Sequence, residues 1–154
     1  MKRFSFSLQA VHNWRSAQLE AAERELASRT AVVTEAQAKL DGLVSQQWKA
    51  SETYLDVLSQ PTVTPDEIAL HTAYLGHLAQ REQVERERLK DLATAQEAQR
   101  SVTLEANRHV QVLDTLQARQ RTQYLTEVKR LEQKSLDEIT TMAFVRRRLE
   151  GQFA

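Results

Sequence analysis

The sequence predicts an all-α fold, a long antiparallel two-helix coiled-coil hairpin with unequal arms. Three observations support this. Both prolines of the 154-residue chain lie within Pro61–Pro65, and apolar residues recur every seven positions on either side of them. Aromatic residues make up only 6% of the chain and there are three glycines, a composition typical of long helices packed along a narrow seam. We therefore expect a single coiled-coil rod spanning residues 1–154.

The turn of the hairpin is predicted at residues 59–65. Proline lacks a backbone donor and clashes with the preceding helical turn, so the first helix, about 4–58, should end near Leu58. The second helix, about 66–150, has a strong start signal in Thr64-Pro65-Asp66-Glu67. A hydroxyl at the N-cap, proline next and then two carboxylates satisfy free amides and oppose the helix dipole.

The first helix carries a heptad stripe that should pack against the second helix. Its positions are Leu19, Ala22, Leu26, Arg29, Val33, Ala36, Leu40, Leu43, Gln47, Ala50, Tyr54 and Val57. Before this stripe, Leu8 and Val11 do not follow the seven-residue spacing. We therefore expect successive seam residues to be 3, 4, 4 and 3 positions apart from Leu8 through Arg15.

The second helix continues this pattern with many small and polar seam residues. Its predicted seam includes Leu92, Ala95, Gln99, Val102, Ala106, His109, Leu113 and Leu116. Steps of four residues then lead through Gln120 to Tyr124 and Val128. Alanine and glutamine bury little apolar area, so the hairpin should be only marginally stable.

The two arms cannot match in length. If the turn centres at Thr62, antiparallel partners have numbers summing to about 124, which places Phe4 opposite Gln120. Everything beyond about Arg121 then lacks a partner within the chain. The apolar stripe of this segment, Tyr124, Val128, Leu131 and Ile139, should be a docking surface. Residues 119–154 are also the basic end, with eight basic and five acidic side chains.

Other function classes find little support. We expect no catalytic residue and no cofactor, because a two-helix rod lacks a water-excluding pocket and carries none of the common catalytic motifs. The four histidines lack metal-ligand spacing, so no metal is expected. The charge distribution is too weak for nucleic-acid binding. No apolar run is long enough to span a bilayer, and polar residues near the start interrupt any signal sequence. The absence of cysteine suits a reducing cytoplasm.

Three stretches of the chain carry recognisable residue patterns. The first is Phe4-x-Phe6-x-Leu8-Gln9-x-Val11. The second is the tip, with Tyr54 before the turn and Tyr74-Leu75-Gly76-His77-Leu78 after it. The third and most specific runs from Leu116 to Glu138. Together they resemble the FliJ family, the stalk component of the flagellar export ATPase, although Ser5 and Ser7 stand where many members have basic residues.

The resemblance implies a non-enzymatic stalk, similar to the central shaft of rotary ATPases, that links three kinds of partner. The paired termini and the unpaired helix would enter and stimulate a hexameric flagellar export ATPase. The tip would face the cytoplasmic domain of the export gate membrane protein, and export chaperones would also bind. The implied ATPase-binding residues are Arg119, Gln120, Tyr124, Glu127, Arg130, Gln133, Lys134, Asp137 and Glu138. The implied gate-binding residues are Tyr54, Tyr74 and Leu78.

The resemblance also implies a cytoplasmic protein associated peripherally with the inner membrane at the flagellar base. Two alternatives stay open from the sequence. One is the equivalent stalk of a virulence-type type III secretion system, and the other is a homodimeric structural coiled coil. Binding of acidic lipid through Phe144–Arg148 is a third and weaker reading, because three arginines are few.

Overall fold

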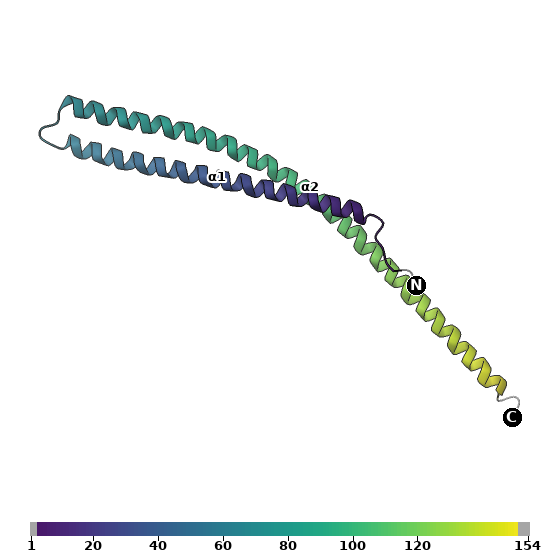
Figure 1. Cartoon of the computed structure of the whole chain (residues 1–154). Coiled ribbons are helices and arrows are strands. Elements are labelled where there is room, and N and C mark those ends of the chain that lie inside the picture. The colour runs from purple at the N-terminus through teal and green to yellow at the C-terminus, as the bar shows by residue number, and fades with distance from the viewer. Residues whose placement is uncertain (1–2, 151–154) are drawn as a thin grey trace. The chain divides into compact units, whose positions relative to one another are not determined.

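The computed structural model describes residues 3–150 and is an all-α helical hairpin (Figure 1). Helix α1 spans Gln9–Leu58 and helix α2 spans Pro65–Glu150, and the two pack against each other. The predicted fold class is therefore confirmed. The first helix was expected from about residue 4 and begins later, because residues 3–6 have no regular structure and residues 7–8 form a turn.

The loop between the helices contains Pro61, whereas Pro65 is the first residue of α2, which begins with a capping box. The Thr64 backbone N–H donates to Glu67 Oε2 at 2.9 Å, and the Glu67 N–H donates to Thr64 Oγ1 at 3.3 Å. These reciprocal bonds satisfy two free amides at the start of the helix. The bonds from the Thr64 backbone N–H and hydroxyl lower the pKa of the Glu67 carboxyl from its ordinary value.

The described residues fall into two units, each defined by its own contacts. The turn unit comprises residues 17–107 and includes the loop. The terminal unit comprises the N-terminal residues through Ser16 and the chain from Arg108 onward. Each is described separately below.

In the turn unit, the seam of α1 is the one that the heptad pattern predicts. All twelve predicted positions from Leu19 to Val57 are buried or half-buried. The core is a cluster of Leu43, Ala50 and Leu78, with Leu75 packed against it. Leu78 is only 2% exposed, which makes it the most buried large side chain among the described residues.

Polar side chains cross the same seam farther from the loop. Arg29 Nη1 donates to the Ala95 carbonyl at 3.2 Å, and Gln96 Nε2 donates to Thr30 Oγ1 at 2.9 Å. The residue numbers in these pairs sum to 124 and 126, close to the predicted register. Such polar contacts join the helices without burying apolar area, so this stretch adds less hydrophobic stabilisation than the core near the loop.

The seam of α2 differs from the prediction at two positions. Val102 is 54% exposed and His109 is exposed, whereas Thr103 and Val110 are half-buried. From Gln99 to Leu113 the inward residues are therefore spaced by 4, 3, 4 and 3 residues, whereas the predicted spacing was 3, 4, 3 and 4. Thr103 is drawn inward because its hydroxyl donates to the Ala22 carbonyl at 3.2 Å.

In the terminal unit, the N-terminal segment lies along α2. The rings of Phe4 and Tyr124 are 5.6 Å apart between centroids, and Phe6 is buried. The predicted partner of Phe4, Gln120, is therefore wrong by one helical turn. The cause is the non-helical start of the chain, since extended residues advance about 3.3 Å each against 1.5 Å in a helix.

The first turns of α1 are fixed to α2 by polar contacts. His12 Nε2 lies 2.6 Å from Asp114 Oδ1, and Gln117 Nε2 donates to Gln9 Oε1 at 3.2 Å. His12 is half-buried whereas Val11 is exposed. The predicted inward position of Val11 is thus wrong, and the imidazole of His12, which contacts Asp114, takes its place in the seam.

Candidate functional site

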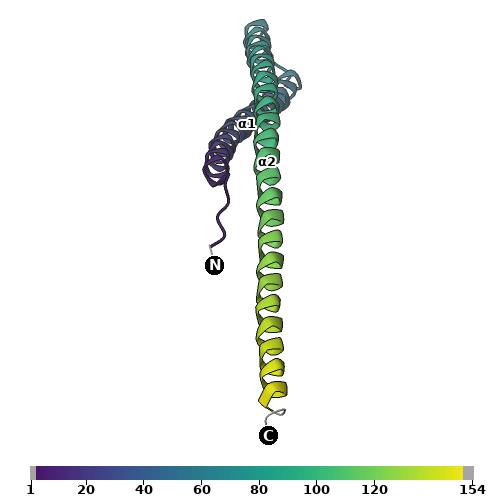
Figure 2. The same cartoon turned by 90° about the vertical axis from the view of Figure 1, so that its right-hand side faces the viewer.

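The feature of the terminal unit most suited to binding is a stretch of α2 that no other described segment covers. Every residue from 129 to 149 is exposed. Figure 2 shows this stretch, towards the yellow end, as a single helix. The expected lack of an intramolecular partner is confirmed for these residues, although the covered part of α2 extends to Val128 rather than ending near Arg121.

An apolar stripe runs along this uncovered stretch. Leu131, Ile139 and Met142 are 50%, 62% and 71% exposed. They continue the line of Tyr124 and Val128, which are half-buried. An isolated apolar side chain on a surface is ordinary, but a periodic series on one helix face indicates an interaction surface.

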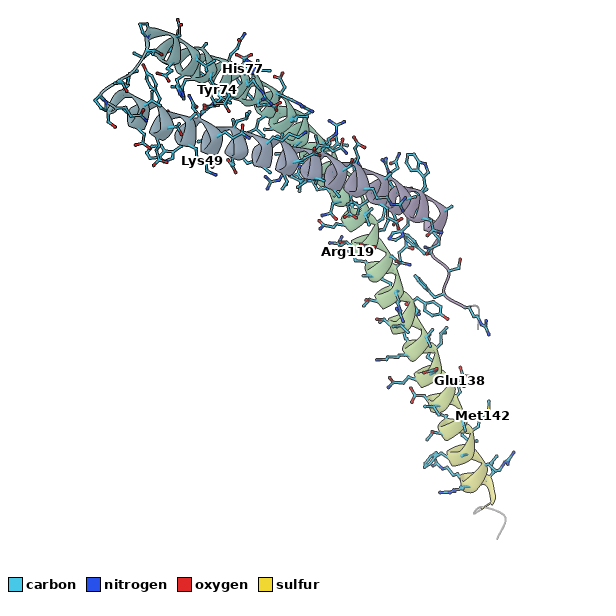
Figure 3. All side chains as sticks on the ribbon, turned by 60° about the vertical axis from the view of Figure 1, so that its left-hand side comes forward. Lys49, Tyr74, His77, Arg119, Glu138 and Met142 are labelled. Carbon is cyan, nitrogen blue, oxygen red and sulfur yellow. The ribbon has the colours of Figure 1, made fainter. Side chains whose placement is uncertain are left out.

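Charged and amide side chains lie beside this stripe. At about 100° per residue, the predicted ATPase-binding residues occupy one half of α2. Seven of them are exposed, namely Arg119, Glu127, Arg130, Gln133, Lys134, Asp137 and Glu138. Arg119 and Glu138 are labelled in Figure 3, with Met142 beyond them. Arg130 Nε lies 3.4 Å from Glu127 Oε2, so two members of the set already interact.

The other two predicted residues, Gln120 and Tyr124, are only half-buried. Tyr124 packs against Phe4 and therefore stands at the border between the covered and uncovered parts of α2. A partner that reached Tyr124 would also meet the N-terminal segment. The sequence signal for this arrangement is the pair of phenylalanines at positions 4 and 6.

Further exposed apolar residues lie near the C-terminal end. Leu136 and Leu149 were not predicted from the sequence, whereas Phe144 and Val145 were named only for the lipid reading. These residues are spread around the helix rather than confined to one stripe, so the heptad pattern did not single them out. Arg147 and Arg148 lie in the last turn, where basic side chains compensate the helix dipole.

The predicted gate-binding residues lie in the turn unit and differ in exposure. Tyr74 is 49% exposed, Tyr54 is half-buried with its ring 6.1 Å from that of His71, and Leu78 is buried in the core. Tyr74 and His77 lie on α2 near the loop (Figure 3). Leu70, which the sequence analysis did not select, is 70% exposed one turn before Tyr74. Leu78 cannot touch a partner while the helices stay paired.

The described residues carry neither a metal site nor a membrane-spanning helix. Within residues 3–150, no three His, Asp or Glu side chains are grouped so that they could hold a metal ion. In the same range, no helix has an apolar stretch suited to crossing a bilayer.

Comparison with known proteins bears on the whole chain. A family model described as "Flagellar FliJ protein" matches residues 4–149, which includes both helices and every predicted site residue. No curated protein and no solved structure matches the chain. The matched range covers nearly all of the helical hairpin, so the chain belongs to the FliJ family and is a flagellar export-associated protein.

Proposed function

We propose that this chain binds a hexameric flagellar export ATPase as a central stalk and stimulates ATP hydrolysis. The observation that carries the proposal is the uncovered stretch of α2, residues 129–149, with its apolar stripe. The FliJ family is a non-enzymatic component of flagellar export, so the role needs a partner that performs the catalysis.

The composition of the uncovered stretch suits the inside of a ring. A single helix that faces six similar subunits must make contacts that can be exchanged from one subunit to the next. Arg130, Lys134 and Asp137 can form charge-assisted hydrogen bonds with any of those subunits. A fully apolar helix would bind one site and release it slowly, whereas charged side chains give specificity and fast association.

In this proposal the residues named from the sequence have two roles. Arg119, Glu127, Arg130, Gln133, Lys134, Asp137 and Glu138 contact the ATPase directly. Tyr124 keeps the N-terminal segment against α2 through Phe4, and both Gln120 and Tyr124 touch the ATPase with their exposed edges. The surface continues on the same side of α2 to Arg108 and Val112, which line a shallow depression with Arg119.

The same proposal assigns the turn unit to the export gate. Tyr74 offers an exposed aromatic ring to the cytoplasmic domain of the gate protein, and Leu70 extends that surface. Tyr54 contributes the part of its ring that His71 leaves free, while Leu78 keeps the two helices paired beneath. Export chaperones bind the same protein, which stays cytoplasmic and reaches the inner membrane at the flagellar base only through its partners.

Charge reversal with an internal control tests the ATPase surface. Arg130 and Arg100 are both on α2, each has a glutamate three residues earlier, and their side chains are 63% and 65% exposed. Arg130 lies on the proposed surface of the terminal unit, and Arg100 lies in the turn unit. We expect Arg130→Glu to lower ATPase stimulation and co-precipitation at least tenfold, and Arg100→Glu to leave both unchanged. Equal effects of the two variants would contradict the proposed surface.

A second test addresses the gate. Tyr74→Ala should weaken binding to the cytoplasmic domain of the gate protein and leave ATPase stimulation intact, because the two surfaces lie in different units.

The two alternative functions can also be weighed. The description of the matching family as flagellar favours the flagellar system over a virulence-type one. Sedimentation of the free chain tests whether it is a homodimer. A dimer that Leu131→Asp dissociates would show that a second copy of the chain occupies the stripe.

A further inference from the structure

Helix α1 carries a second apolar stripe that does not face α2. It consists of Val44, Trp48, Leu55 and Leu58, all of them exposed, with Trp48 at 69%. Each stands one position after a residue of the seam, so the stripe repeats the heptad spacing about 100° around the helix. A helix with two adjacent heptad stripes has the pattern of one that packs between two neighbours.

The second stripe is confined to the end of α1 near the loop. Upstream, the residues that follow seam positions are acidic, polar or small: Glu23, Ala27, Thr30, Thr34, Gln37 and Asp41. A general tendency of α1 to place apolar side chains beside its seam would show in those positions too. The change at Val44 therefore marks a distinct surface.

The side of α2 that lies next to this second stripe has room for another helix. The two helices of an antiparallel pair are related by a two-fold axis, so residues that follow seam positions lie on the same side of both. On α2 these residues are Ala69, Thr72, Gly76 and Ala79, all small and exposed. A Cβ built at Gly76 would meet no atom within 4 Å, so nothing within the described chain requires glycine there. Small side chains let a neighbouring helix approach closely.

The surroundings of this surface are acidic. Residues 41–80 contain five acidic side chains (Asp41, Glu52, Asp56, Asp66 and Glu67) and one basic side chain (Lys49), a net charge of −4 with histidine neutral. None of the five forms an ion pair with another residue of the described range, whereas Glu20, Glu25 and Glu35 upstream each have a basic partner at i+4. Asp66 and Glu67 oppose the dipole of α2 at its first turn, so the charge that favours a basic partner is that of Asp41, Glu52 and Asp56 on α1.

We propose that this surface binds an amphipathic helix of another protein, about 15 residues long, with Lys or Arg beside its apolar stripe. The length follows from the stripe, since the fifteen residues from Val44 to Leu58 span about 21 Å. Trp48 is the anchor, as expected of an exposed tryptophan at the centre of an interface. The site is distinct from Tyr54, Tyr74 and Leu78 and does not depend on the ATPase or the gate.

Synthetic peptides provide the probe. The full chain carrying Trp14→Phe keeps Trp48 as its one tryptophan, whose emission reports burial. It is titrated with a helical Leu/Lys peptide of about 15 residues with leucines at heptad spacing. Two controls are a Leu/Glu peptide with the same leucine positions and a Leu/Lys peptide of scrambled order. We expect a blue shift with the first peptide and none with either control.

Two variants test the surface from opposite helices. Trp48→Gln, followed by calorimetry, should weaken binding of the Leu/Lys peptide at least tenfold. Gly76→Gln should do the same, because its side chain fills the space that the peptide needs, yet it should not lower the melting temperature. The matched control is Val102→Gln, a similarly exposed apolar residue of the turn unit, which should bind as the unchanged chain does.

Three results would overturn the proposal. Unchanged binding in both Trp48→Gln and Gly76→Gln would place the peptide elsewhere. Equal binding of the Leu/Glu or the scrambled peptide would show that neither charge nor heptad spacing matters. A free chain that sediments as a dimer, and that Trp48→Gln converts to a monomer, would show that the occupant is a second copy of this chain.

Discussion

Two stretches of α2 carry similar apolar repeats in different surroundings. In residues 75–92 the repeat lies against α1, and its apolar members Leu75, Leu78, Leu89 and Leu92 are buried or half-buried, with Glu82 and Glu85 at the inward positions between them. In residues 129–149 the repeat has no described neighbour, and Leu131, Ile139 and Met142 are exposed. The comparison shows that an apolar repeat defines which face of a helix can pack against a partner. The length of the other helix decides whether the chain itself covers that face.

The largest predicted effect contrasts one leucine from each stretch. Leu78→Ala should lower the free energy of unfolding by about 2–4 kcal/mol, because it leaves a cavity in the Leu43–Ala50 cluster. Leu131→Ala should change it by less than about 0.5 kcal/mol, as expected of an exposed position. Urea denaturation followed by circular dichroism measures both. Similar losses in the two variants would mean that Leu131 is covered by the chain's own residues.

The capping box of α2 should matter at an intermediate level. Thr64→Ala removes the acceptor for the Glu67 N–H and should destabilise the turn unit by about 1 kcal/mol. The folded-state pKa of Glu67 is lowered, so its contribution is present at neutral pH and is lost as the pH falls through that lowered pKa. NMR titration should find the Glu67 pKa closer to its ordinary value in Thr64→Ala. No change on substitution would show that the Thr64 hydroxyl does not contribute and that the backbone N–H of residue 64 alone lowers the pKa.

Substitution of Gly42 should raise the free energy of unfolding by about as much as loss of the capping box lowers it. A Cβ at this position of α1 would meet no atom within 4 Å, so alanine fits without strain. Gly42→Ala should stabilise the helix by up to about 1 kcal/mol by reducing the freedom of the unfolded chain. The midpoint of urea denaturation should rise. A lower midpoint would show that the glycine is needed for a bend or a close contact.

The smallest effect concerns the contact between His12 and Asp114 in the terminal unit. Asp114→Asn should destabilise the attachment of α1 to α2 by roughly 0.5 kcal/mol, because the carboxylate is largely exposed to solvent. Hydrogen exchange of residues 9–16 should become faster while that of the turn unit stays unchanged. Unaltered exchange at residues 9–16 would show that the apolar contacts of Phe4 and Phe6 suffice to hold this segment.

Much of the fold follows from local signals in the sequence. The end of α1 at Leu58 and the capping box at Thr64 depend on prolines and side chains within one or two turns. The seam of α1 repeats every seven residues with few exceptions, so each predicted position faces inward.

The errors arise where neighbouring residues compete for the seam. Val102 is more apolar than Thr103, but only Thr103 can donate to a carbonyl across the seam. Val11 loses its inward position to His12 in the same way, through Asp114. The sequence also could not predict which site residues are exposed. Leu78 and Tyr74 lie in one motif, yet Leu78 is buried in the core and Tyr74 is on the surface.

The central claim is that a partner ATPase covers residues 129–149 of α2. Hydrogen–deuterium exchange of the full chain, alone and with the assembled hexameric ATPase, tests it most directly. We predict fast exchange at residues 129–149 in the free chain, slow exchange near Leu43 and Leu78, and strong protection of residues 129–149 when the ATPase is added. Residues 129–149 already protected in the free chain, or unprotected in the complex, would contradict the claim.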